Sequence, residues 1–234
     1  MTGESGLHRA RPDQAGTRRT TAPPGAAAPP NAAAPPNAAA PPNAAARRRP
    51  PRDPGAPRPL RLFVALDVPD AVRDALAAAG AAADQDVWRP VAPDALHVTL
   101  AFLGSRLPED VAAIAPIVAA EHEAPRLALG DVLLLPPRRA RVLTAALDDP
   151  SGALHRLQGR VSAALAAAGV YTPESRPFRP HVTIARLRPR VRPPRTAGVD
   201  LDPLPFSATA VSLYASRLHP SGARYEALAR ATLG

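Results

Sequence analysis

The sequence predicts an α+β domain built on antiparallel strands and preceded by a segment that does not fold. Two observations lead to this prediction. The composition changes near residue 60, because proline and alanine fill 30 of the first 60 positions and are less frequent afterwards. Beyond that point, short apolar runs with strand character are mixed with three helix-like stretches over about 175 residues. We therefore divide the chain into a tail of residues 1–59 and a domain of residues 60–234.

The tail has the composition of a disordered segment. A six-residue unit, A-P-P-N-A-A, recurs from Ala28 to Ala46 and offers no apolar face to bury. We expect it to be disordered with polyproline II character. The first 60 residues carry nine arginines against three carboxylates, a charge of +6. That charge suits a weak tether to nucleic acid or another anionic surface, but a solubilising tail explains it more simply and is the interpretation we favour.

The first half of the domain is expected to contain two strands and two helices. The strands cover Leu60–Leu66 and Leu96–Leu103, and the helices run from Pro69 to about Ala83 and over Leu107–His122. Gly104 should close the second strand, and Pro116 should kink or shorten the second helix.

The second half is expected to contain one helix and five strands. A helix capped by Ser151 should run to Ala168 and end at Gly169. The strands cover Arg126–Leu135, Arg141–Leu147, Pro180–Leu187, Phe206–Ala215 and Arg224–Leu233.

Composition excludes several classes of protein. The chain has no cysteine, which excludes a disulfide scaffold, thiolate metal sites and a cysteine nucleophile. No run of 18 apolar residues is present, and Met1 to Gly6 is not followed by the apolar core of a secretory signal. We expect a cytoplasmic monomer with no membrane span. Its 29 basic residues are all arginine, and the domain keeps a charge of only +3.

The most informative feature is a repeated phrase. His97-Val98-Thr99-Leu100-Ala101 and His181-Val182-Thr183-Ile184-Ala185 are nearly identical and lie 84 residues apart. Because alternate residues of a strand share a face, each phrase predicts one imidazole and one hydroxyl on a polar face, about 7 Å apart, with aliphatic residues on the other. A lone histidine on a strand is usually structural, but two copies of the whole phrase predict a site in which both strands face one ligand.

Paired histidines suit displacement at a phosphodiester. With an unperturbed pKa near about 6.5, one imidazole can accept a proton while the other donates one. The threonine hydroxyls can donate hydrogen bonds to the non-bridging phosphate oxygens. Two histidines without a carboxylate on the same face make a poor metal site, so we expect neither a metal nor another cofactor.

These residues resemble the two-histidine (2H) phosphoesterases, which carry paired H-x-T-x motifs, and in particular the RNA 2′,3′-cyclic phosphodiesterases first described as 2′–5′ RNA ligases. The resemblance covers about residues 60–234 and rests on four segments: Arg61–Pro69, Leu96–Gly104, Arg176–Arg186 and Leu213–Ser216. It implies a bilobal α+β fold, with two antiparallel-sheet lobes and flanking helices around a central cleft lined by the motif strands.

The resemblance also implies roles for single residues. His97 would be the general acid that protonates the leaving ribose oxygen, and His181 the general base that activates water. Thr99 and Thr183 would bind the phosphate. Arg186, five residues after His181, would contact the phosphate too, although strict alternation places it on the opposite face unless a bulge or a strand end intervenes.

Other positions receive simpler interpretations. Arg176 and Arg179 are expected at the entrance of the cleft, Asp67 as a loop-facing carboxylate, and Trp88 in the core or beside the cleft. Val64 and the strand over Arg141–Leu147 lack aromatic residues that are common in the family, which predicts less surface for base stacking. The remaining histidines are expected to have ordinary roles: His8, His122, His155 and His219.

The implied activity is metal-independent hydrolysis of RNA 2′,3′-cyclic phosphate ends to 2′-phosphomonoesters. Two alternatives remain open. One is a phosphodiesterase acting on another small cyclic phosphate, such as ADP-ribose cyclic phosphate, or on 2′–5′-linked oligonucleotides, with ligation as the reverse reaction. The other is an RNA-end-binding protein without turnover, although both intact H-x-T pairs argue against it.

Overall fold

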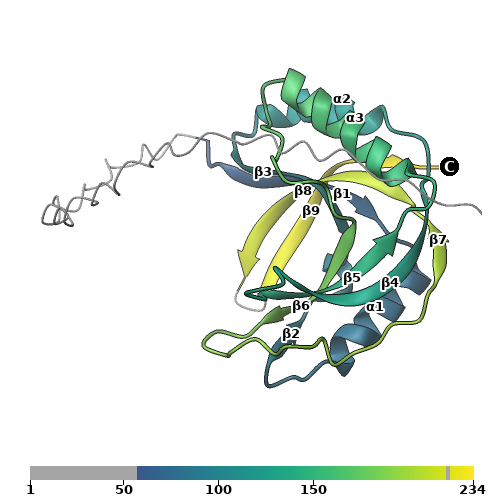
Figure 1. Ribbon diagram of the computed structural model, residues 1–234. Helices are drawn as coiled ribbons and strands as arrows, with labels where there is room; N and C mark the ends of the chain where they lie inside the picture. Colours follow the sequence, from purple (N-terminus) through teal and green to yellow (C-terminus); the bar gives the residue numbers. More distant parts are fainter. Residues whose placement is uncertain (1–56, 220–221) are drawn as a thin grey trace, which may run out of the picture. The chain divides into compact units, whose positions relative to one another are not determined.

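The computed structural model describes residues 57–219 and 222–234 (Figure 1), and the predicted α+β class is confirmed. The predicted tail falls on residues outside the described ones, apart from 57–59. The helices are α1 (Asp70–Ala82), α2 (Asp110–Ala119) and α3 (Ala153–Ala167), with a short 3₁₀ turn at Pro93–Ala95. The strands are β1 (Leu60–Asp67), β2 (Trp88–Pro90), β3 (Val98–Arg106), β4 (Arg126–Leu135), β5 (Val142–Asp148), β6 (His181–Leu187), β7 (Pro205–Ser207), β8 (Ala210–His219) and β9 (Gly222–Thr232).

The strands form one antiparallel sheet in the order β7-β4-β5-β6-β3-β1-β8-β9, and β2 pairs with the end of β6. The sheet is strongly curved (Figure 1). Among the described residues, the strand pairing that joins its two halves is that of β3 with β6, at Val98 and Val182. We call β3, β1, β8 and β9 the His97 half, and β7, β4, β5, β6 and β2 the His181 half. These halves are the two lobes that the sequence predicts.

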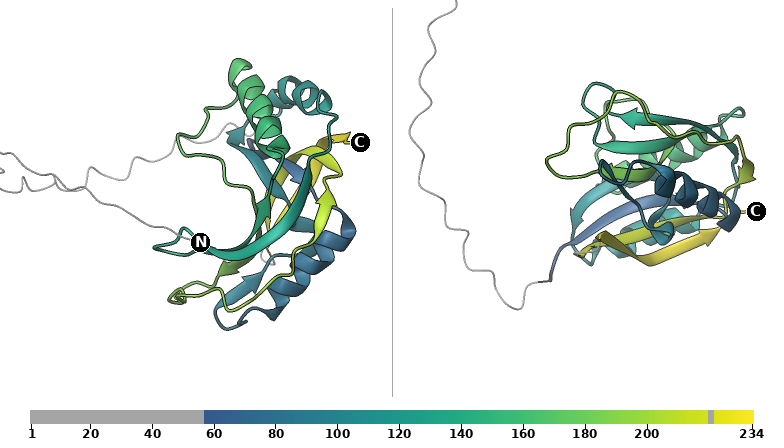
Figure 2. Two further views of the ribbon diagram at one scale, coloured as in Figure 1. Left: turned by 45° about the vertical axis from the view of Figure 1, so that its right-hand side comes forward. Right: turned by 90° about the horizontal axis from the view of Figure 1, so that it is seen from below.

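Helices cover the outer surface of each half. Helix α1 packs against β6 and β2, whereas α2 lies on β8 and β9 and α3 on β3 (Figure 2). The approach of α1 to β6 is close enough to require a glycine. A Cβ atom at Gly80 would lie 2.8 Å from the carbonyl oxygen of Ile184, which is a clash with main chain that cannot move aside.

The core lies between the helices and the sheet. Leu62, Val64 and Leu66 point from β1 into the core cluster and are fully buried. The alternate residues Phe63 and Ala65 are buried as well, so both faces of this central strand are covered. Trp88 is 1% exposed and anchors β2, as one of its two predicted placements requires. Burial of each large side chain contributes about 1.5–3 kcal/mol to folding, so β1 and β2 are held firmly beneath the polar surface that faces the cleft.

Strand β3 and helix α2 end at positions that can be compared with the predicted ones. Strand β3 does not end at Gly104 but continues to Arg106. Gly104 has φ of +73° and lies beside an unpaired residue, so it bends the strand without ending it. Helix α2 ends at Ala119 with Pro116 inside it, which confirms the predicted shortening.

Two further differences from the prediction lie on the C-terminal side. The N-cap position of α3 is Gly152, with φ of +69°, but the hydroxyl of Ser151 accepts the N–H of Ala153 at 3.3 Å, so Ser151 helps to cap the helix from one position earlier. The carboxylate of Asp149 accepts the N–H of His155 at 3.0 Å, so a side chain four positions before the helix shares the capping function. The strand predicted over Phe206–Ala215 is in fact two strands, β7 and β8, which pair with different neighbours.

Candidate active site

The two motif phrases meet at the junction of the sheet halves. His181 begins β6 and His97 immediately precedes β3. Val98 and Val182 pair with each other and are fully buried. In an antiparallel register this pairing sets His97 across from Thr183 and His181 across from Thr99. The predicted alternation is confirmed, because the valines face the core while the histidines and threonines are partly or fully accessible.

Both imidazoles are oriented in the same way. Nδ1 of His97 donates to the carbonyl oxygen of Ala95 at 2.8 Å, and Nδ1 of His181 donates to that of Arg179 at 2.7 Å. Each bond reaches the carbonyl two residues earlier, and each leaves Nε2 as the proton-accepting atom of the neutral ring. The hydroxyl of Thr99 donates to Nε2 of His97 at 3.1 Å.

A bulge follows each motif and changes which residues face the cleft. Leu100 has no partner between Thr99 and Ala101 in the pairing with β1, and Ile184 has none between Thr183 and Ala185 in the pairing with β5. Each bulge returns the fifth residue after the histidine to the cleft face. The bulge that Arg186 needs is therefore present. In the other motif the same position is occupied by Phe102, which is 46% exposed.

All five residues predicted for the site line one cavity of about 410 Å³. They are His97, Thr99, His181, Thr183 and Arg186. The cavity is also lined by residues of β1, β2 and β9 and by neighbours of these strands: Arg61, Phe63, Arg89, Val91, Ala95, Phe102, Ser216, Ala223 and Tyr225. No carboxylate is found among these described lining residues, so the cavity favours an anionic ligand.

His97 lies against an aromatic wall. The ring of Phe63 is 4.8 Å from its imidazole, and Tyr225 meets it edge-on at 5.3 Å. Burial lowers the pKa of His97 from 6.5 to about 4, and the positive charges of Arg186 and His181 act in the same direction. The Ala95 carbonyl and the carboxylate of Asp67 oppose this shift of the pKa but do not cancel it.

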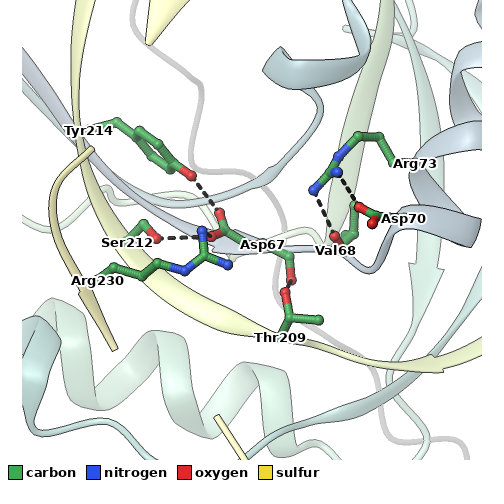
Figure 3. A network of polar contacts seen from close by, with 8 residues as sticks. All are labelled: Asp67, Val68, Asp70, Arg73, Thr209, Ser212, Tyr214 and Arg230. Carbon is green, nitrogen blue, oxygen red and sulfur yellow. Dashed lines mark hydrogen bonds and ion pairs between the residues drawn. The ribbon is translucent and has the colours of Figure 1, made fainter. Parts of the chain in front are cut away.

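Asp67 is not the loop-facing carboxylate that the sequence predicts. It ends β1, is only 5% exposed and is surrounded by donors (Figure 3). Ser212 and Tyr214 donate their hydroxyls to it at 2.9 Å each, and Arg230 forms an ion pair with it, also at 2.9 Å. A buried carboxylate requires such partners, and sequence reasoning missed them because they come from β8 and β9, more than 140 residues away.

The network connects Asp67 to the aromatic wall. Tyr214 donates to Asp67 at one end of its side chain, and its ring stacks on Phe63 at 5.4 Å. Phe63 in turn contacts His97. The buried carboxylate thus fixes the aromatic residues against which the His97 imidazole rests.

The chain also matches known proteins along the part that builds this site. The sequence model of the 2′-5′ RNA ligase superfamily matches residues 68–219, which include both motif strands. The chain belongs to this superfamily. The resemblance to the 2H phosphoesterases inferred from the sequence is thereby confirmed.

Curated relatives in the superfamily are matched over nearly their whole length. The RNA 2′,3′-cyclic phosphodiesterase of Escherichia coli (strain K12) is 31% identical over 182 residues, which is 74% of this chain and 96% of that protein. The protein of the same name from Thermus thermophilus is 32% identical over 188 residues, covering 74% of this chain and 90% of the relative.

Solved structures of the superfamily have the same fold. E. coli LigT complexed with 3′-AMP superposes with a TM-score of 0.62 at 30% identity, covering 75% of this chain and 98% of LigT. TT0787 of Thermus thermophilus gives a TM-score of 0.61 at 29% identity, covering 74% and 97% of the two chains.

One part of the expectation drawn from the superfamily pattern is wrong. Val64 does not reduce the aromatic surface of the cleft, because it faces the core and is fully buried. Phe63, the neighbour of Val64, faces the cavity instead, and Phe102 and Tyr225 add two further rings to the lining. For β5 the expectation stays a prediction, since Val142, a residue without an aromatic ring, pairs with Arg186 and lines another cavity.

A second, larger cavity of about 830 Å³ adjoins the first and shares Thr99, Phe102 and His181 with it. Arg176 and Arg179 line this second cavity and are exposed. Their position agrees with the entrance role predicted from the sequence. Arg141 lies there as well.

Sequence reasoning missed several lining residues. Phe102 could have been found, since it occupies the position in the first motif that Arg186 occupies in the second. Arg89 and Tyr225 carry no such signal, because only the folding of β2 and β9 brings them to the cavity.

The remaining histidines play no part in this cavity where the structure describes them. His155 binds Asp149 at 2.7 Å and lies against Phe178, and His122 accepts the terminal N–H of Gly234 at its main-chain oxygen. His8 and the side chain of His219 lie outside the described part. Within that part, no three acidic or histidine side chains gather as metal ligands, and no helix has the length and apolarity of a membrane span.

Proposed function

We propose that the domain of residues 60–234 is a phosphodiesterase that opens RNA 2′,3′-cyclic phosphate ends to 2′-phosphomonoesters without a metal. The observation that carries the proposal is the duplicated site: two His-Thr pairs, with both imidazoles oriented by the carbonyl two residues earlier, line one cavity without carboxylates. The curated relatives named RNA 2′,3′-cyclic phosphodiesterase support the choice of substrate.

The proposed reaction is an in-line displacement at phosphorus. The oxygen of a water molecule forms a bond to phosphorus while the bond from phosphorus to the 3′ oxygen breaks. Nε2 of His181 accepts a proton from the water, and Nε2 of His97 donates a proton to the departing 3′ oxygen. The products are a 2′-phosphomonoester and a free 3′-hydroxyl, and the two histidines exchange protonation states in each turnover.

Thr99, Thr183 and Arg186 would stabilise the charge that develops on the non-bridging oxygens. The hydroxyls donate hydrogen bonds, and the guanidinium supplies a full positive charge. When His97 is protonated, its Nε2 no longer accepts the hydrogen bond from Thr99, so the Thr99 hydroxyl is released to donate to the phosphate.

The low pKa of His97 is compatible with its role as an acid. In the empty cavity, burial favours the neutral imidazole, with a pKa of about 4. A bound phosphodiester adds a negative charge beside the ring and raises this pKa. Substrate binding would therefore bring a proton to His97, and only the complex would hold the acid in its active form.

The direct test uses an oligoribonucleotide with a 2′,3′-cyclic phosphate end, incubated in EDTA with wild type, His97→Ala and His181→Ala. We expect wild type alone to produce a 2′-phosphate end efficiently. Loss of wild-type activity in EDTA would contradict the metal-free mechanism. Binding of the oligonucleotide without product under single-turnover conditions would favour an RNA-end-binding protein instead.

One observation favours a second candidate activity. The larger cavity begins at His181, on the side where the proposed mechanism places water, and it has room for a nucleoside. A 5′-linked nucleoside at that position would make 2′–5′-linked oligonucleotides substrates, with ligation as the reverse reaction. Cleavage of a 2′–5′-linked dinucleotide at a rate comparable to that of the cyclic substrate would favour this second activity.

A further inference from the structure

The cavity holds more positive charge than one phosphodiester needs. Arg61, Arg89 and Arg186 all line it. Within the described ranges, none of the three has a carboxylate at ion-pair distance. Arginines elsewhere on the domain do have such partners, for example Arg160 with Glu121 and Arg217 with Glu226.

Arg89 and Arg186 stand directly opposite each other. They are paired residues of the antiparallel strands β2 and β6, so their Cβ atoms are about 5 Å apart. Like charges at directly opposite positions destabilise a sheet. Two arginines that face each other with no carboxylate at ion-pair distance among the described residues therefore indicate a place where anionic groups bind.

The short strand β2 holds Arg89 firmly in this position. Its neighbour Trp88 is buried in the core. Main-chain hydrogen bonds tie both ends of β2 to β6 and its extension: Val91 N–H donates to Ile184 at 2.9 Å, and Arg188 N–H donates to Val87 at 2.9 Å. The side chain of Arg89 is exposed to the cavity while its main chain is fixed.

The scissile phosphate does not account for both arginines. A cyclic phosphodiester carries one negative charge, which Arg186 and the protonated His97 already balance in the proposed mechanism. Arg61 is placed elsewhere, since its guanidinium lies 5.4 Å from the centre of the Phe102 ring. Arg89 is left facing the substrate with no partner for its charge.

We propose that Arg89 binds a second phosphate of the substrate, the one attached to the 5′ oxygen of the terminal nucleotide, beside the scissile phosphate at Arg186. This inference rests on the proposed function. It makes the preferred substrate an RNA end or a 5′-phosphorylated cyclic nucleotide, and it makes a cyclic nucleoside phosphate without a 5′-phosphate a poor substrate.

The test compares two substrates that differ by this phosphate alone: adenosine 2′,3′-cyclic phosphate and its 5′-phosphorylated form. A hydrogen bond to a charged group is worth about 1.5–3 kcal/mol, so we expect wild type to prefer the second substrate in kcat/KM by about 10- to 100-fold. In Arg89→Gln this preference should fall close to one. The control Arg192→Gln removes an exposed arginine that is absent from the cavity lining, and it should keep the wild-type preference.

Failure of this inference is distinguishable from failure of the proposed function. If wild type hydrolyses both substrates equally well, or if Arg89→Gln slows both by the same factor, the second-phosphate site is wrong although the reaction stands. If neither of these substrates nor the cyclic-ended oligoribonucleotide is hydrolysed, the proposed function is wrong. In that case the affinities of the protein for 2′-AMP and adenosine 2′,5′-bisphosphate, measured by calorimetry, test the second-phosphate site separately. Tighter binding of the bisphosphate that is lost in Arg89→Gln supports the site, and equal affinities of wild type for the two ligands overturn it.

The unfolding temperature of Arg89→Gln tests whether Arg89 has a structural partner. Because Arg89→Gln removes a contact between like charges, we expect it to unfold at the same temperature as wild type or at a higher one in the absence of phosphate. A marked fall in that temperature would show that Arg89 has a structural partner, which would contradict the proposal.

Discussion

The two halves of the sheet carry the same phrase in different surroundings. In both motifs Nδ1 of the histidine donates a hydrogen bond to the carbonyl oxygen two residues earlier. A threonine on the cleft face follows, and after it a bulge. In the His97 half the imidazole lies against Phe63 and Tyr225, and the bulge presents Phe102. In the His181 half the bulge presents Arg186, which faces Arg89.

This difference shows how a duplicated motif can support two roles. The aromatic wall buries His97, and burial lowers its pKa, so in the proposed mechanism the proton on this ring depends on the bound phosphate. Among the described residues no aromatic ring is packed on His181 as Phe63 is on His97, and His181 adjoins the larger cavity, from which the proposed mechanism takes its water. Neighbouring residues, and not the motif itself, thus separate the proposed acid from the proposed base.

Loss of either histidine should have the largest effect. We expect His97→Gln and His181→Gln each to reduce kcat by about 10²–10⁴-fold, the usual contribution of general acid–base catalysis. Because the two groups act in one step, the double variant should lose less than the product of the two single effects. Single-turnover rates on a cyclic-phosphate oligonucleotide measure this, and a single variant with nearly normal kcat would remove that histidine from the mechanism.

Substitution of Arg186 and of Phe102, the residues that follow the two bulges, should change different kinetic constants. Arg186→Gln removes a charged hydrogen bond worth about 1.5–3 kcal/mol, so kcat/KM should fall about 10- to 100-fold, mostly through kcat because the bond strengthens in the transition state. Phe102→Leu removes a stacking surface worth about 1–3 kcal/mol per base and should mainly raise KM. Steady-state kinetics of both variants on one substrate make the comparison, and identical profiles would contradict the division of roles.

The pH dependence should respond to Asp67. As the proposed acid, His97 must be protonated. On the limb of the pH profile that His97 controls, kcat/KM therefore falls as the pH rises above the pKa of about 4 that this imidazole has in the free enzyme. The charges that act on this ring are Asp67, which raises its pKa, and Arg186 and His181, which lower it. Asp67→Asn removes the carboxylate, so the limb should move to lower pH by a fraction of a unit.

Ser212→Ala is the matched control for Asp67→Asn. It removes one hydrogen bond to Asp67 and no charge, so the limb should stay close to that of wild type. A limb that moves to higher pH in Asp67→Asn, or that moves equally in both variants, would show that the carboxylate does not act on His97 through its charge.

Much of the site could be predicted from the sequence because the motifs are local. The period of a strand assigns His97, Thr99, His181 and Thr183 to one face, and the repetition of the phrase indicates that the two strands share a site. The need for a bulge at Arg186 could be inferred too, since strict alternation would have turned it away from the cleft.

The remainder of the site depends on contacts that are distant in the sequence. Asp67 looks like a loop residue until Ser212, Tyr214 and Arg230 are brought to it by β8 and β9. The split of β7 from β8 and the continuation of β3 beyond Gly104 likewise depend on pairing partners. Local propensity does not encode which strands become neighbours.

The central claim is that His97 gives a proton to the leaving oxygen while His181 takes one from water. A cyclic substrate with sulfur in place of the 3′ oxygen tests it most directly, because a thiol has a pKa near about 8.5 and leaves as a thiolate without a proton donor. We predict that this substrate restores most of the activity of His97→Ala relative to wild type and none of that of His181→Ala. The assignment would be contradicted if this substrate restored the activity of His181→Ala instead, or if both variants remained equally slow relative to wild type.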